Sequence, residues 1–172
     1  MQVTDLKASE YYPYYKTYIS KVSDEMSLVE GFKKGEVKIV NFFESIPNDK
    51  LEYRYAEDKW SVKEIFQHII DTERVFMYRC FRIARNDKTP LAGYEQDDYI
   101  DPSHANEKSI TDLIEEYKSV RHSFILLLKS LKDSDLKFIG NASENVMSSR
   151  AAAFITIGHE IHHIEVIKER YL

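Results

Sequence analysis

Apolar residues recur at steps of three and four along most of this chain. On an α-helix this spacing gathers them on one side, so the pattern predicts amphipathic helices. The first stripe carries Asp24 and Glu25 in its opening turn, where acidic side chains suit a helix N-terminus. We expect four long helices, which run from Ser23 to Pro47, from Ser61 to about residue 85, from Ser109 to Leu131, and from about Ser148 to the C-terminus.

Two of the predicted helices open with a capping sequence. Ser61 is followed three residues later by Glu64, and Ser109 is followed in the same way by Asp112. In this arrangement each side chain hydrogen-bonds to the backbone of the other residue at the start of the helix. Pro47 ends the first helix, because proline lacks the N–H that a helix interior needs. These signals place helix ends independently of the apolar stripes.

The connection between the second and third predicted helices, residues 86–108, is unusually long. Antiparallel neighbours in a bundle are joined by about two to eight residues, so this segment predicts a crossover that makes the two helices parallel. The second and fourth helices are then antiparallel. We expect His104 and an acidic cluster in this connection to be solvated surface, with contact to a metal or substrate as the alternative for the cluster; it comprises Glu95, Asp97, Asp98 and Asp101.

Composition supports helices and narrows the range of partners. Five Gly and four Pro in 172 residues are few for the turns of an all-β fold. We therefore predict an all-α protein, a four-helix bundle with a long crossover between helices 2 and 3, in which residues 1–172 form one domain. The net charge is −5, and basic residues are scattered among acidic ones. We expect no nucleic-acid or membrane partner, but a small neutral or cationic molecule.

Cys80 is the single cysteine, which excludes an internal disulfide. Apolar residues flank it at helical spacing, so packing in the core is favoured over a role as a reactive thiol. His122 lies opposite the apolar stripe of its helix and is expected to face water. The N-terminal residues lack the apolar core of a signal peptide, and no run reaches the length of a membrane span. These observations predict a cytoplasmic protein.

Tyrosines crowd the stretch YYPYYKTYI, around a proline that suits the first turn of a short helix. The favoured interpretation is an aromatic arm that closes the core. A platform for a substrate is the alternative, which lacks the converging polar groups that usually accompany one. The tyrosines concerned are Tyr11, Tyr12, Tyr14, Tyr15 and Tyr18.

The candidate chemistry lies in the C-terminal stretch GHEIHHIEVIKERYL. His159 and His163 are four positions apart, which on a helix puts both imidazoles on one side, about 40° apart around the axis. His68 and His163 each lie roughly 10 Å from the end of their helix. If these helices are antiparallel, the two levels coincide and three imidazoles converge. Three protein ligands with an open position are typical of a catalytic divalent metal.

Alternatives remain for each residue of this stretch. A lone histidine beside an apolar stripe is usually a hydrogen-bonded core residue, but the spaced pair with a third at matching depth favours metal binding. His162 is either a partner that orients a ligand or an exposed neighbour. His159, Glu160 and His163 also satisfy the zinc-protease signature H-E-x-x-H, although too few residues follow for its usual third ligand. Glu160 remains a candidate catalytic base that activates a water at the metal, or a solvated side chain.

Several segments resemble those of the DinB-like proteins of the DinB/YfiT superfamily. They are KWS before the second helix, HIIDTER around His68, RIARNDKTPL at the end of that helix, and GHEIHH near the C-terminus. The resemblance covers most of the chain, from YYPYYKTYI onward. It implies a four-helix bundle with a long crossover, often dimeric, that holds a divalent metal such as nickel or zinc on His68, His159 and His163.

The resemblance also implies classes of function. Relatives in the wider superfamily include transferases and isomerases that use bacillithiol, mycothiol or glutathione, with a metal that activates the thiol as thiolate. Many members are described only as metal-dependent hydrolases. We therefore expect an enzyme whose metal activates water or a low-molecular-weight thiol, acting on a small molecule, and we expect a homodimer. The alternative is a non-catalytic stress-response bundle that binds a metal or a small ligand.

Overall fold

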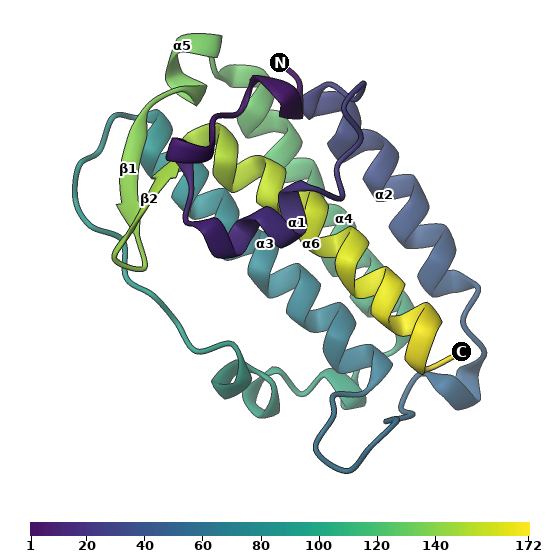
Figure 1. Cartoon of the computed structure of the whole chain (residues 1–172). Helices are drawn as coiled ribbons and strands as arrows, with labels where there is room; N and C mark the ends of the chain where they lie inside the picture. The colour runs from purple at the N-terminus through teal and green to yellow at the C-terminus, as the bar shows by residue number, and fades with distance from the viewer.

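The computed structural model describes all 172 residues. Four long helices form a bundle (Figure 1): α2 (Leu28–Glu44), α3 (Val62–Ala84), α4 (Ile110–Ser130) and α6 (Ser149–Arg170). Two short helices, α1 (Lys16–Ile19) and α5 (Asp133–Leu136), and one hairpin of β1 (Ile139–Ala142) with β2 (Asn145–Ser148) complete the regular structure. Single 3₁₀ turns occupy Val3–Asp5, Ala8–Glu10, Pro13–Tyr15, Asn48–Lys50, Asp97–Tyr99, Asp101–Ser103 and Ala105–Glu107.

The predicted capping sequences begin two of the long helices. The Ser61 hydroxyl accepts a hydrogen bond from the backbone N–H of Glu64, whose carboxylate accepts one from the N–H of Ser61. Ser109 caps α4 in the same way. Ser148 caps α6 by accepting from the N–H of Ala151. The three predicted starts are confirmed.

The predicted start of the first long helix at Ser23 is wrong. Helix α2 begins at Leu28, with Ser27 in an extended conformation before it. Asp24 and Glu25 belong to a turn, and the N–H of Leu28 donates to the carbonyl oxygen of Met1. The chain therefore bends here to pair with the N-terminal segment, a contact that the apolar stripe could not indicate.

The crossover is confirmed by the path of the chain. After α3 the connection runs back along the whole length of the bundle before α4 begins, so α3 and α4 point in the same direction (Figure 1). Helix α6 runs in the opposite direction beside α3. The all-α four-helix bundle with a long crossover is thus the fold of this protein.

The hairpin of β1 and β2 was not predicted. Its two central residues, Ser143 and Glu144, have positive φ angles of 52° and 62°. Gly, Asn and Asp commonly mark such turns, so a Ser-Glu pair gives little signal in the sequence. The hairpin is held from both sides, because Leu91 bridges to Ala142 and Tyr11 bridges to Met147. It therefore joins the crossover and the N-terminal segment to the bundle.

Two separate hydrophobic clusters make up the core. The larger contains 22 buried residues around Phe32, Phe124 and Phe154, and the smaller contains 16 around Phe43, Phe66 and Tyr117. On α6 the larger cluster ends at Ile157 and the smaller one contributes Ile167, so the residues between them lie at the boundary of the two. This middle layer of the bundle holds the polar groups described below. No helix of the structure has the length and apolar character of a membrane span.

Candidate metal centre

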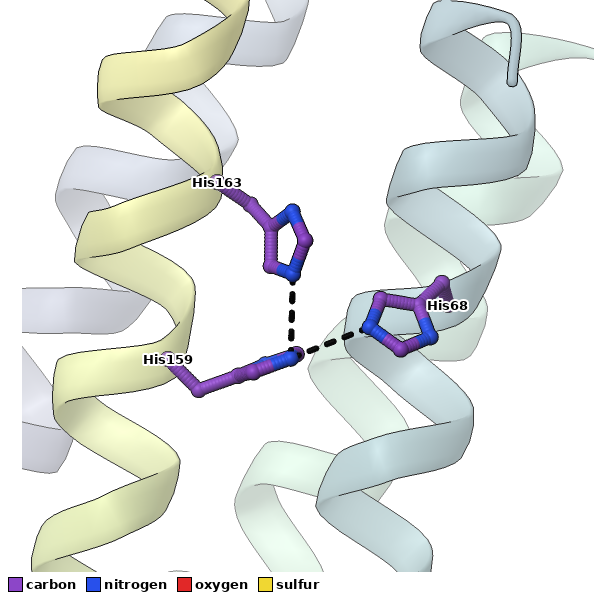
Figure 2. A group of neighbouring side chains, drawn as sticks. All are labelled: His68, His159 and His163. Atoms are coloured by element: carbon purple, nitrogen blue, oxygen red, sulfur yellow. Dashed lines mark hydrogen bonds between the residues drawn. The ribbon is translucent and has the colours of Figure 1, made fainter. Parts of the chain in front are cut away.

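Three imidazole rings converge between α3 and α6. The Nε2 atom of His159 lies 3.0 Å from Nε2 of His68 and 3.0 Å from Nε2 of His163. Figure 2 shows the three rings turned toward one another, with His68 on one helix and the other two on its neighbour. One ligand atom from each residue lies within 4.8 Å of the others. His68 and His159 are buried, and His163 is half-buried.

The positions in the helices explain this convergence. His159 and His163 are one turn apart on α6, so their side chains lie on the same side of that helix. His68 is within the second turn of α3, and His163 is at a similar distance from the end of α6. Because the two helices are antiparallel, these levels meet, as the sequence predicted. The packing of α3 on α6 thus sets the geometry of the group.

Burial keeps the three imidazoles neutral. It lowers the pKa of His68 to about 4. Burial also lowers the pKa of His159 and of His163 well below the usual value, and the neighbouring histidines lower it further. Neutral imidazole is the form that ligates a metal. No Asp or Glu belongs to the group. Three neutral imidazoles are a donor set that suits zinc, nickel, copper or iron, so the residues fit a divalent metal.

Polar and aromatic groups surround the imidazoles. The Thr72 hydroxyl lies 3.5 Å from Nδ1 of His68 and 3.3 Å from the Tyr94 hydroxyl. The Trp60 ring lies 4.8 Å from that of His68. The Tyr18 ring packs edge-on at 5.2 Å from that of His159. These contacts pack against the rings of His68 and His159 and restrict their orientation.

His162 does not join the three converging rings. It is half-buried, and its ring packs edge-on against Tyr18 at 5.5 Å and against His163 at 5.2 Å. Partial burial lowers its pKa. His162 is therefore not the exposed neighbour that the sequence left open; it packs against the ring of His163, as the alternative role of a partner beside a ligand would have it.

Glu160 does not face the three imidazoles, which corrects its expected role as a base beside the metal. Its carboxylate is fully enclosed and accepts hydrogen bonds from the Arg121 guanidinium and, at 3.1 Å, from the Tyr117 hydroxyl. Adjacent residues of a helix point about 100° apart, so the helix that aims His159 at α3 aims Glu160 toward α4. The H-E-x-x-H spacing is present here, but its glutamate bonds Arg121 and Tyr117 instead of facing the histidines.

Arg121 is fully buried, although the sequence pattern of its helix gives no sign of this. Its guanidinium binds Glu73 through two bonds, Nε to Oε1 at 2.8 Å and Nη2 to Oε2 at 2.7 Å, and also binds Glu160. Its Nη1 donates to the carbonyl oxygen of Phe32 at 3.2 Å. A single Arg in an amphipathic helix normally suggests solvent, and its partners lie on two other helices. We call Arg121, Glu73, Glu160 and Tyr117 the Arg121 cluster.

A cavity of about 250 Å³ opens beside His159, which is the one of the three histidines that lines it. His159 and Thr72 form part of its wall. Three tyrosines of the N-terminal stretch line it as well, which supports the substrate-platform alternative for these residues, while Tyr11 is buried in the core as an arm would be. The tyrosines of the wall are Tyr14, Tyr15 and Tyr18.

Other candidate residues lie where the sequence predicted. Cys80 is buried, its thiol lies 3.2 Å from the Ser149 hydroxyl, and burial raises its pKa to about 12, so it packs in the core as an unreactive thiol. His104 and His122 are exposed. The acidic cluster of the crossover is exposed too, although Glu95 reaches the edge of the cavity.

The fold and the three imidazoles define a helical bundle with a candidate metal centre, and comparison with known proteins gives the family. The model of the DinB superfamily matches residues 32–167. That is more than half of the chain, so the protein belongs to the DinB superfamily. No curated protein matches the chain.

Two solved structures from Bacillus subtilis share the fold. YfiT, described as a probable metal-dependent hydrolase with an unusual four-helix bundle topology, is 17% identical with a TM-score of 0.73, and the match covers 87% of this chain and 90% of YfiT. The DinB-like protein YjoA is 20% identical with a TM-score of 0.58, covering 83% and 87% of the two chains. At these identities the likeness establishes the fold alone.

Proposed function

We propose that this protein is a metal-dependent enzyme in which His68, His159 and His163 hold a divalent metal, zinc or nickel. The observation that carries the proposal is the convergence of three Nε2 atoms beside a cavity. A divalent metal on three imidazoles lowers the pKa of a water or thiol ligand and so supplies a nucleophile near neutral pH. The description of YfiT as a probable metal-dependent hydrolase is consistent with this class.

The chain's own groups have distinct roles in this proposal. Thr72 positions the ring of His68 through its Nδ1 atom. Trp60 packs against the ring of His68 and Tyr18 against that of His159, which restricts how these rings turn. Burial raises the pKa of Tyr94, so its hydroxyl stays protonated at the cavity wall and can donate a hydrogen bond to a substrate.

Charge supports an anionic reaction partner at the centre. The three imidazoles are neutral and no carboxylate accompanies them, so nothing offsets the charge of a divalent ion there. A thiolate fits such a centre without a separate base, whereas hydrolysis commonly uses one. Transfer of a low-molecular-weight thiol is therefore the first reaction to test, and hydrolysis of a small ester or amide is the second.

Metal content tests the assignment of the ligands. We expect His68→Ala to lose most of the bound metal while the circular dichroism spectrum stays helical, because the ring lies in a polar layer between two apolar clusters. The matched control is His122→Ala on the exposed face of α4, which should bind metal like the wild type. Protein purified without a nickel column is measured by elemental analysis. Equal metal content in both variants would contradict the proposal.

Turnover separates the enzyme from the alternative, a non-catalytic bundle that binds metal or a small ligand. The metallated protein is assayed with bacillithiol, mycothiol or glutathione plus a model electrophile, and with small esters and amides without a thiol. We expect a rate above background in one series that His68→Ala abolishes. A metallated, folded protein with no activity in either series would favour the non-catalytic alternative.

We also propose a homodimer, in line with the resemblance described above. Sedimentation equilibrium of the full chain tests it directly. A mass that stays near 20.3 kDa at high protein concentration would exclude the dimer.

A further inference from the structure

Arg79 is a buried cation without an acidic partner. Its side chain on α3 is 2% exposed, and it takes part in no ion pair. Its Nη2 donates to the carbonyl oxygen of Ala92 at 3.2 Å and to the Ser143 hydroxyl at 2.8 Å. Its Nε and Nη1 atoms donate to no protein group. Burying a guanidinium without a charged partner destabilises the folded state. The presence of Arg79 here therefore points to a role other than stabilising the fold.

Arg79 lies in the wall of the cavity that His159 also lines. Its guanidinium sits over the Phe76 ring, 5.1 Å from the ring centre, and 5.8 Å from the centre of the Tyr94 ring. Aromatic contacts of this kind use the flat faces of a guanidinium and leave its edge for hydrogen bonds in the plane. Nη2 is engaged by Ala92 and Ser143, so the free N–H groups of Nε and Nη1 are the donors available to a carboxylate, which accepts a charge-assisted hydrogen bond from one of them.

We propose that the cavity binds a small molecule whose carboxylate pairs with Arg79 and whose apolar or aromatic body lies against the tyrosines of the N-terminal stretch. The opposite end of the molecule then lies toward His159. This last part rests on the proposed function, because it makes the ligand a substrate or co-substrate of the metal centre. Binding of the carboxylate itself needs no metal.

Residues on one side of α3 extend from His68 in the histidine group to Arg79 in the cavity wall. His68, Thr72, Phe76 and Arg79 follow one another at steps of four, four and three, which keeps them on one side of the helix. The first and last of these are about 16 Å apart along the axis at the level of their Cα atoms. Long side chains of a helix lean toward its N-terminus, which brings the guanidinium closer to the imidazoles.

The volume restricts the ligand to a small one. The cavity of about 250 Å³ is below the range of roughly 300–1,000 Å³ that is typical of sites for drug-sized ligands. A single guanidinium at one end and ring faces along the walls suit a compact monocarboxylate. A phosphate, with more charge and more oxygens, would require further donors.

Local charge here differs from the charge of the whole chain. The net charge of −5 suggested a neutral or cationic partner, but the enclosed charge that faces this cavity is that of Arg79. Glu95 is the one acidic residue in the wall; it is exposed and forms no ion pair with Arg79. A bound carboxylate would supply the missing negative charge.

The proposal is tested by comparing how tightly the 172-residue chain binds phenylacetate and its neutral amide, phenylacetamide. We expect phenylacetate to bind about tenfold or more tightly, because a hydrogen-bonded charge pair contributes about 1.5–3 kcal/mol and 1.4 kcal/mol is tenfold. In NMR spectra of ¹⁵N-labelled protein, the Nε–H signal of Arg79 should shift with phenylacetate and not with the amide. Equal affinities, or an unmoved signal, would overturn the proposal.

Two variants and one further ligand, phenyl phosphate, test the carboxylate site more closely. Arg79→Gln removes the charge but keeps a polar side chain at the cavity wall, and should lose the preference for the acid while it still binds the amide. Glu95→Gln should bind phenylacetate at least as tightly as the wild type. Weaker binding by Glu95→Gln, an unchanged preference in Arg79→Gln, or tighter binding of phenyl phosphate than of phenylacetate would each contradict a carboxylate site at Arg79.

The His68→Ala variant distinguishes this proposal from the proposed function. If the variant loses metal but still prefers phenylacetate to its amide, both proposals stand. If it keeps its metal and the preference, the metal assignment fails and the carboxylate site stands. If the wild type loads metal on the histidines but shows no preference, the carboxylate site alone is wrong.

Discussion

Arg121 heads the set of large side chains that are fully buried in this protein. Its guanidinium faces two carboxylates, so three charges are removed from water in the Arg121 cluster. Burial raises the pKa of Glu73 to about 7, although Arg121 opposes the shift. Burial also raises the pKa of Glu160, again against Arg121. Removing one charged member of the cluster therefore leaves a buried charge unpaired and destabilises the fold.

We predict that Arg121→Met strongly destabilises the fold. The substitution leaves Glu73 and Glu160 buried without a cation, which costs about 3–5 kcal/mol in the free energy of unfolding. Urea denaturation followed by circular dichroism measures the loss. The matched control is Arg85→Met, at an exposed position just past α3, where we expect a change within about 0.5 kcal/mol. A similar small effect at both positions would show that the cluster is not a stabilising unit.

Single residues show what sequence can predict about a site. The three histidines could be predicted from two properties of the sequence. Residue spacing shows which side of a helix a side chain occupies, and loop length shows in which direction the next helix runs. Together they determine which side chains meet. The sequence left Glu160 as a candidate base or a solvated side chain, and it is neither placed toward the histidines nor exposed, because nearness in sequence to His159 is not nearness in space on a helix. Arg79 and Arg121 were missed because their surroundings are formed by segments far apart in the chain, including the hairpin.

At the scale of elements, α1 packs unusually close to α6. A Cβ atom added at Gly158 would lie 2.0 Å from the carbonyl oxygen of Tyr18, a backbone atom that cannot move by itself. Tyr18 in turn packs on His159. The glycine therefore allows the N-terminal segment to lie over the imidazoles and to line the cavity.

We predict that Gly158→Ala displaces α1 and destabilises the protein by about 1–3 kcal/mol, as overpacking does. Thermal melting measures the effect. Because Tyr18 moves with α1, affinity for phenylacetate should fall as well. The control is Gly93→Ala, where an added Cβ would meet the nearest atom, Oγ of Ser143, at 3.4 Å. If Gly158→Ala melts like this control, the close approach of α1 does not limit the packing.

The end of the crossover is joined to α3 and α4 through Glu116. This carboxylate accepts hydrogen bonds from Gln67 at 3.0 Å, from Lys108 at 2.9 Å and from Arg74 at 2.7 Å. Burial raises the pKa of Glu116, but these three donors outweigh it and lower the pKa to about 2. The ionised carboxylate thus connects two parallel helices and the segment between them.

We predict that this connection is lost in acid. Because the pKa of Glu116 is lower in the folded chain than the usual 4.5, its contribution is complete above pH 4.5 and disappears as the pH falls toward 2. Glu116→Gln should therefore cost about 1–2 kcal/mol at pH 7 and almost nothing near pH 2. Urea denaturation of both proteins across this range measures the difference. A constant difference at every pH would contradict the prediction.

At the scale of the whole molecule, the bundle could be predicted because it follows from local patterns and one loop length. Four apolar stripes predict the four long helices, and the length of the connection after Ala84 predicts their relative directions. The hairpin and the late start of α2 could not be predicted, because each depends on contacts with the N-terminal segment or the crossover. The polar middle layer depends on all four helices at once.

The arrangement of two apolar clusters around this layer leads to a prediction about metal removal. Clusters of 22 and 16 buried residues lie on either side of the imidazoles, so the bundle has enough apolar contact to fold without a metal. We expect the chelated protein to melt cooperatively, but at a lower temperature. A ligand present at a thousand times its dissociation constant adds about 4 kcal/mol, and about 2–4 °C accompanies each kcal/mol in a domain of this size, so the shift is roughly 10 °C.

Melting curves of the wild type with metal and with chelator give this shift, and His68→Ala provides the control. The variant has lost a ligand, so chelator should leave its melting temperature unchanged. A chelated wild type that unfolds gradually, without a cooperative transition, would mean that the metal completes the core. A cooperative melt with a shift that depends on metal concentration would mean that the folded bundle presents the three imidazoles to the metal already in place, as catalysis at an open coordination position requires.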